Sequence, residues 1–154
     1  MKIYKLFLIS ATLLSQIVSA DVLRFYQINE SSEKLCEEAL LDDSNAINQK
    51  LKNHLITIVN VDPDKSFNVD STTKNGNKLV ITGKLFTESE DHNKKLLGIT
   101  LHTINKDSDG ILIKTEVNLK YDTPQLIGAL CNKESSESKG TIASKLWFAT
   151  LTKK

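Results

Sequence analysis

The amino-acid sequence predicts an α+β fold, in which an antiparallel β-sheet meander carries an N-terminal helix and a short second helix on one face. Three observations lead to this prediction. Three consecutive segments alternate apolar and polar residues with the period of two that is typical of strands. A helical spacing of apolar residues precedes them, and a Thr-Pro helix start follows them. One disulfide is expected to hold the two helices together.

Residues 1–20 have the pattern of a secretory signal peptide. Lys2 and Lys5 precede an apolar run, and the segment ends in the small residues Val18-Ser19-Ala20. The apolar run is shorter than the ~20 residues of a membrane-spanning helix. We therefore expect cleavage before Asp21, export to the periplasm or the extracellular space, and no stable membrane anchor afterwards. An uncleaved N-terminal anchor or a buried first helix is the alternative.

Cleavage would leave residues 21–154, a length typical of a single globular domain. The full chain has 20 basic and 19 acidic residues, so the domain without Lys2 and Lys5 is close to neutral. A near-neutral chain lacks the basic surface of a nucleic-acid-binding protein. Arg24 is the only arginine, although bidentate recognition of phosphate usually uses arginine. A nucleic-acid partner is therefore not expected.

The sequence contains two cysteines, Cys36 and Cys131. In an exported protein an even number of cysteines favours a disulfide. In the chain-entropy model a bridge that closes so long a loop stabilises a protein by roughly 4–5 kcal/mol. Two free buried thiols, or one nucleophilic cysteine, are the alternatives. The cysteines and three histidines are spread along the chain without zinc-ligand spacing, so we expect no metal and no cofactor.

Before the meander, the sequence predicts a short strand or arm and then a helical region. Residues 21–29 form an apolar stretch that suits a strand or an arm on the core. Apolar residues at helical spacing then run from about Ser31 to Leu55. Polar residues interrupt this pattern in the middle, so one long helix and two short helices with a cap at Asp43 or Ser44 are both compatible with it.

Two further strands are expected between the helical region and the meander. Residues 55–61 are rich in β-branched side chains, which favour a strand. The segment around Phe67 is expected to form the next strand. Asn75-Gly76 predicts a tight turn that leads from that strand into the meander.

The clearest part of the sequence is the meander itself. Its strands are expected at residues 78–87, 95–105 and 111–121. Pairing Leu85 with Leu97, and Asn105 with Ile111, places the apolar odd-numbered residues of all three strands on one face. A slip by one residue in any strand would turn its apolar set to water, so this agreement predicts which face is buried.

After the meander, Asp122-Thr123-Pro124 predicts the start of a short helix, with Thr123 as its N-cap and Pro124 at its first position. This helix would end at Cys131 and bring that residue to Cys36 of the first helix. Residues 141–152 most resemble a last strand, and a terminal helix is the alternative.

The even-numbered face of the meander is the candidate binding surface. It combines apolar side chains with lysines, and such a mixture on a sheet face is typical of an interaction surface. Alternatively, the N-terminal arm, through Phe25, or the last strand, through Trp147, covers this face. The candidate residues are Val80, Phe86, Leu96, His102, Ile104, Leu112 and Lys114.

The sequence contains no catalytic or phosphate-binding motif. Our leading hypothesis is a small exported, non-catalytic binding protein, of the inhibitor or immunity type, with a protein partner. A carrier of a small apolar ligand is the second hypothesis. A small hydrolase that acts through His102 or a loop carboxylate is the third. Asn29-Glu30-Ser31 is a glycosylation sequon that would be used only in a eukaryotic secretory route.

Overall fold

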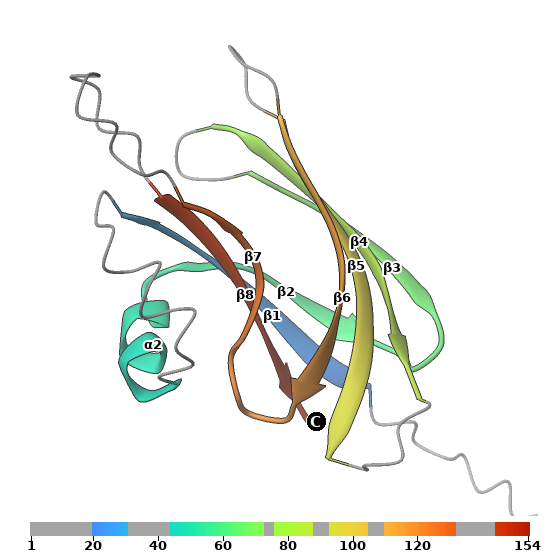
Figure 1. Ribbon diagram of the computed structural model, residues 1–154. Coiled ribbons are helices and arrows are strands. Elements are labelled where there is room, and N and C mark those ends of the chain that lie inside the picture. The colour runs from blue at the N-terminus through green and yellow to red at the C-terminus, as the bar shows by residue number, and fades with distance from the viewer. Residues whose placement is uncertain (1–19, 31–43, 73–75, 88–92, 105–109, 132–143) are drawn as a thin grey trace, which may run out of the picture.

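The computed structural model describes residues 20–30, 44–72, 76–87, 93–104, 110–131 and 144–154. Within these ranges, eight strands form two four-stranded antiparallel sheets, and one helix lies on the outside of one sheet (Figure 1). The predicted α+β fold is therefore wrong. The apolar face of the meander packs against a second sheet and not against helices.

The predicted meander forms most of the first sheet, whose strand order is β3-β4-β5-β6. Its strands are β3 (Ser66–Thr72), β4 (Lys78–Phe86), β5 (Lys94–Ile104) and β6 (Ile111–Lys120). The β4–β5 register is confirmed, with Leu85 opposite Leu97. The β5–β6 register is wrong by two residues, because Thr103 lies opposite Ile111 and its hydroxyl accepts a hydrogen bond from the Ile111 amide at 2.9 Å. A shift by two keeps the odd-numbered residues on one face, so the prediction of the buried face holds.

The second sheet has the strand order β2-β1-β8-β7. Its strands are β1 (Asp21–Glu30), β2 (Leu55–Val61), β7 (Gln125–Leu130) and β8 (Ser144–Thr152). The strand predicted at 55–61 is confirmed, the segment 21–29 forms a strand rather than an arm, and the last predicted strand is confirmed over its described residues 144–152. The predicted second helix is wrong, because its residues form β7 and pair with β8. The Thr123 hydroxyl bonds back to the carbonyl of Tyr121 at 3.3 Å, so it does not cap a helix.

The helix α2 (Ser44–Leu51) packs on the outside of the second sheet, away from the meander (Figure 1). Its buried residues Ile47 and Leu51 contact Ile28, Leu146 and Phe148 of β1 and β8. Its start agrees with the alternative of two short helices. The expected helical segment before it lies in 31–43, outside the described residues.

The predicted disulfide has only one of its cysteines in the described part of the chain. Cys36 lies outside the described residues, which therefore contain no complete disulfide. Cys131 directly follows β7 and is not a free thiol. The Cys36–Cys131 pairing stays a prediction, but it would not join two helices, since the segment before Cys131 is a strand.

The chain changes from one sheet to the other at two corners, and each corner contains an aspartate with a positive φ. Asp64, between β2 and β3, has a φ of 61°, and Asp122, between β6 and β7, has a φ of 56°. Aspartate is among the non-glycine residues that adopt this left-handed conformation most readily. Because β1 also pairs with β8, the strands follow one another in chain order around the whole sandwich.

The inner faces of the two sheets form one hydrophobic core. The second sheet contributes Leu23, Phe25, Trp147, Ala149 and Leu151, and the first contributes Leu79, Ile81, Leu85, Leu97, Leu101 and Leu119. All of these side chains are at most 1% exposed. A water-sized void beside them would leave part of their surface exposed, so these side chains fill the space around them.

A hydrogen bond between Tyr121 and Asp21 links the second corner to the start of β1. The Tyr121 hydroxyl donates to Oδ2 of Asp21 at 2.8 Å, and Asp21 is only 8% exposed. Burial, and then the bond to this carboxylate, raise the pKa of Tyr121 from 10.0 to about 12. The folded state therefore favours the neutral phenol more strongly than the unfolded chain does.

We expect Tyr121→Phe to reduce the free energy of unfolding by about 1–3 kcal/mol at neutral pH, because Asp21 loses its buried donor. A raised pKa contributes stability below the unfolded value, and this contribution is lost as the pH rises through the folded value. The difference between wild type and variant should therefore shrink between pH 10 and about 12. Urea unfolding at several pH values measures it, and a difference that does not change over this range would contradict the assignment.

Candidate binding site

The even-numbered side chains of β3–β6 form the outer face of the first sheet. No described element packs on this outer face, because β1 and β8 belong to the opposite sheet and α2 lies beyond that sheet (Figure 1). Phe25 and Trp147, the residues expected to cover the face, are buried between the sheets. Both predicted coverings are therefore wrong, and the outer face is open as far as the structure describes the chain.

The registers place the side chains of the outer face in rows that run across the strands. One row contains Ser66, Lys84, Gly98 and Glu116. The next contains Asn68, Thr82, Thr100 and Lys114. The third contains Asp70, Val80, His102 and Leu112. Short side chains thus lie at Gly98 in the first row and at Thr82 and Thr100 in the second, and the longer side chains of Lys84, Glu116 and Lys114 lie beside them.

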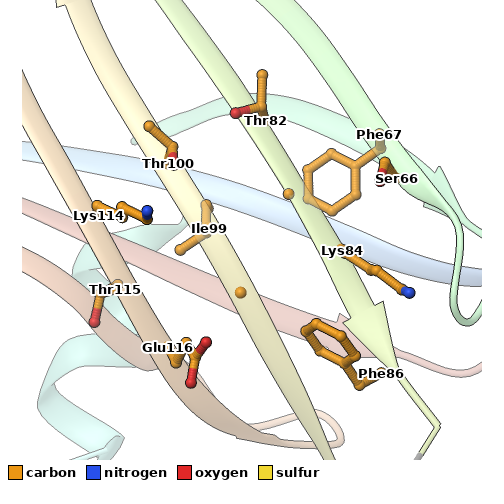
Figure 2. A pocket seen from close by; sticks show the side chains of 12 residues that line it. Ser66, Phe67, Thr82, Lys84, Phe86, Ile99, Thr100, Lys114, Thr115 and Glu116 are labelled. Atoms are coloured by element: carbon orange, nitrogen blue, oxygen red, sulfur yellow. The ribbon is translucent and has the colours of Figure 1, made fainter.

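These short side chains leave a shallow hollow of about 690 Å³ on the sheet (Figure 2). The hollow is lined by Ser66, Phe67, Thr82, Gly83, Lys84, Phe86, Gly98, Ile99, Thr100, Lys114, Thr115 and Glu116. Gly98 is the residue that keeps it open. A Cβ atom at this position would lie 3.3 Å from the Phe86 ring, so any longer side chain would fill the space.

Charged and aromatic side chains flank the hollow from both sides. Lys84 and Phe86 come from β4, whereas Lys114 and Glu116 come from β6 (Figure 2). The Lys84 ammonium lies 5.0 Å from the centroid of the Phe86 ring, a cation–π distance. Among the described residues, neither Lys84 nor Lys114 forms an ion pair. Both charges are therefore available to a ligand.

The remaining candidate residues form an apolar patch next to the hollow, defined by Val80, His102, Ile104 and Leu112. Leu112 is 66% exposed and Ile104 is 43% exposed. His102 lies between Val80 and Leu112. The predicted pairing of Asn105 with Ile111 would place Lys114 opposite His102 and Ile104 opposite Leu112. Both of these pairings are wrong because of the two-residue shift between β5 and β6.

The structure brings the seven predicted residues to one face but divides them into two groups. Phe86 and Lys114 line the hollow, and Leu96 lies opposite Phe86 on the neighbouring strand. The other four form the apolar patch. Sequence reasoning missed the role of Gly98, although a glycine inside a strand is a recognised sign of close approach by another group.

The geometry gives little support to the hydrolase and carrier hypotheses. His102 has no hydrogen bond or ion pair to any described residue, so no carboxylate in the described part of the chain orients it as a general base. No group of metal-ligating side chains occurs within the described ranges. The eleven core side chains named above leave almost no exposed surface, so this described part of the core gives no support to a carrier, which needs an enclosed apolar cavity.

Comparisons with known protein families, with curated proteins and with solved structures find no match for this chain. Among the described helical residues, none forms a helix with the length and apolar character needed to cross a bilayer. The function must therefore be argued from the surface of the molecule.

The corner between β2 and β3, which contains Asp64, is hydrogen-bonded to the end of β4 beside the hollow. The Asp64 carboxylate accepts hydrogen bonds from the Thr87 amide, at 3.1 Å, and from the Thr87 hydroxyl. The Asp64 amide donates to the Leu85 carbonyl at 2.7 Å. The hydroxyl and amide of Thr87 hold the pKa of Asp64 below its ordinary value of 3.8, and the charge of Lys84 adds to this effect. The ionised carboxylate thus positions the strand end that carries Phe86.

We expect Asp64→Ala to destabilise the protein at neutral pH. A lowered pKa contributes stability above the unfolded value, and that contribution is lost as the pH falls through the folded value. The destabilisation should therefore diminish below about pH 3.8. Thermal melting across the acidic range measures it.

Asp122→Ala is the matched control for this prediction. Asp122 has a similar positive φ, but its carboxylate has no hydrogen-bond partner among the described residues. Asp122→Ala should lower the melting temperature by an amount that does not change across the acidic range. An equal dependence on pH in both variants would contradict the role assigned to the Asp64 carboxylate.

Proposed function

We propose that this protein is an exported, non-catalytic binding protein of the inhibitor or immunity type, and that it binds a protein partner through the outer face of β3–β6. The observation that carries the proposal is the open outer face itself. It combines a hollow with two adjacent large aliphatic side chains, Leu112 and Ile104, that are substantially exposed. Exposed apolar groups within a polar surround mark interaction sites on soluble proteins.

The architecture suits such a role. Two packed sheets give a rigid support, and a rigid surface loses little conformational entropy when it binds. Export is supported by the signal-peptide pattern and by the position of β1, which begins at Asp21. Cleavage after Ala20 would therefore leave every described strand complete.

We expect Thr100→Arg to weaken the complex with the partner by at least about tenfold, because a long side chain in the middle of the hollow blocks contact. The partner is retrieved from the exported fraction with the tagged protein, identified, purified and then titrated by calorimetry. The partner should also raise the melting temperature of the wild-type protein, because it binds only the folded state.

Ile58→Asp is the matched control, because Ile58 is 53% exposed on β2 of the other sheet. It should leave the affinity unchanged. Equal affinity of wild type and Thr100→Arg, or an equal loss in both variants, would contradict the proposed surface. Failure to recover any partner that co-elutes with the wild-type protein would count against the binding function.

A further inference from the structure

We propose that the outer face recognises an extended, acidic segment of the partner protein that also carries aliphatic side chains. This inference rests on the proposed function, because it names the chemistry of the partner at the same site. It follows from three properties of the face: its charge, the position of two lysines beside the hollow, and the apolar patch next to them.

The outer face is basic, although the chain as a whole has 20 basic and 19 acidic residues. Its lysines are Lys78, Lys84, Lys94, Lys114 and Lys120, and its carboxylates are Asp70 and Glu116. Positive charge is thus concentrated on the face that contains the hollow, and it attracts an acidic partner there.

Two of these lysines lie on opposite sides of the hollow. Lys84 comes from β4 and Lys114 from β6, so β5 lies between them (Figure 2). Strands two apart in a sheet are separated by about 10 Å, whereas acids two residues apart share one face of an extended chain and are about 7 Å apart. The long, flexible lysine side chains span the difference. An extended segment that lies across Gly98 and Thr100 can therefore place one carboxylate near each ammonium group.

The apolar patch distinguishes a peptide from other polyanions. Leu112 precedes Lys114 by two residues on the same face of β6, and it is 66% exposed. Nucleic acids and sulfated glycans carry high negative charge but no aliphatic side chains. A peptide that combines Asp or Glu with Leu or Val satisfies both the lysines and the patch, so the mixed chemistry of the face favours a protein segment.

The probe for this inference is a fluorescein-labelled ten-residue peptide in which every second residue is Asp, Glu, Leu or Val and the residues between them are threonine. The acidic and the aliphatic side chains then share one face of the extended peptide. Its control is the same peptide with lysine at every acidic position. Fluorescence anisotropy with the whole protein should show binding of the acidic peptide only. The affinity should fall at least about tenfold when salt is raised from roughly 0.05 M to 0.5 M, because exposed charges are then screened.

Charge-reversal variants test the two lysines. Lys84→Glu and Lys114→Glu should each weaken binding of the acidic peptide about fivefold or more, since each turns an attraction into a repulsion. Lys52→Glu makes the same change at an exposed lysine just beyond α2 and should have no effect. Circular dichroism confirms folding, and Lys84→Gln and Lys114→Gln replace any variant that does not fold.

Several outcomes would overturn the inference. These are equal binding of the lysine peptide, equal affinity in the lysine variants, or tighter binding of heparin or oligothymidylate at the same lysines. The natural partner separates this inference from the proposed function. If its binding is lost in Thr100→Arg but unchanged in both lysine variants, the surface stands and the acidic chemistry is wrong. If neither substitution weakens it, the proposed binding surface is wrong, whereas failure to recover any partner counts against the binding function.

Discussion

The packing of two apolar sheet faces against each other determines where every other feature of this protein lies. Side chains alternate along a strand, so burying Ile81, Leu101 and their odd-numbered neighbours between the sheets obliges the even-numbered residues to face outward. The hollow, the lysines and the apolar patch are all consequences of this one constraint. The two corners, each with an aspartate at positive φ, let the chain pass from one sheet to the other while the inner faces stay in contact.

The alternation of apolar and polar residues along the strands explains both what the sequence predicted correctly and what it missed. It predicted the strands of the meander and their buried face, because these strands have one apolar and one polar side. It could not detect the two-residue shift between β5 and β6, since a period of two is unchanged by it. Three strands of the second sheet were predicted, but the sheet itself was missed, because β7 was predicted as a helix. In addition, β8 is buried on both faces and lacks the polar side that would have indicated its place in a sheet: Trp147 points into the core, whereas Phe148 packs beneath α2. The Thr123-Pro124 pair resembles a helix start but belongs to a corner.

The candidate site was predictable to a similar extent. The seven residues chosen from the sequence all lie on the outer face, because the parity of each strand was right. The hollow could not be predicted from the sequence. It depends on the absence of a side chain at Gly98 and on the register that places Lys84 and Glu116 opposite this residue. A sequence pattern shows which side chains are present, but it does not show which residues are neighbours across strands. That information comes only from the register. Together, the open face and its uneven charge support the proposal that this surface binds a partner.

The account depends on the claim that the odd face of β3–β6 is buried and the even face is open. Lysine substitution at neighbouring positions tests this claim most directly, in the pairs Val80 and Ile81, Thr100 and Leu101, and Asn118 and Leu119. Urea unfolding should show losses of about 3 kcal/mol or more, or failure to fold, at each odd position, because a charge is buried without a partner. At each even position the change should stay within about 1 kcal/mol. Equal losses at odd and even positions would show that the outer face is covered, and would contradict the account.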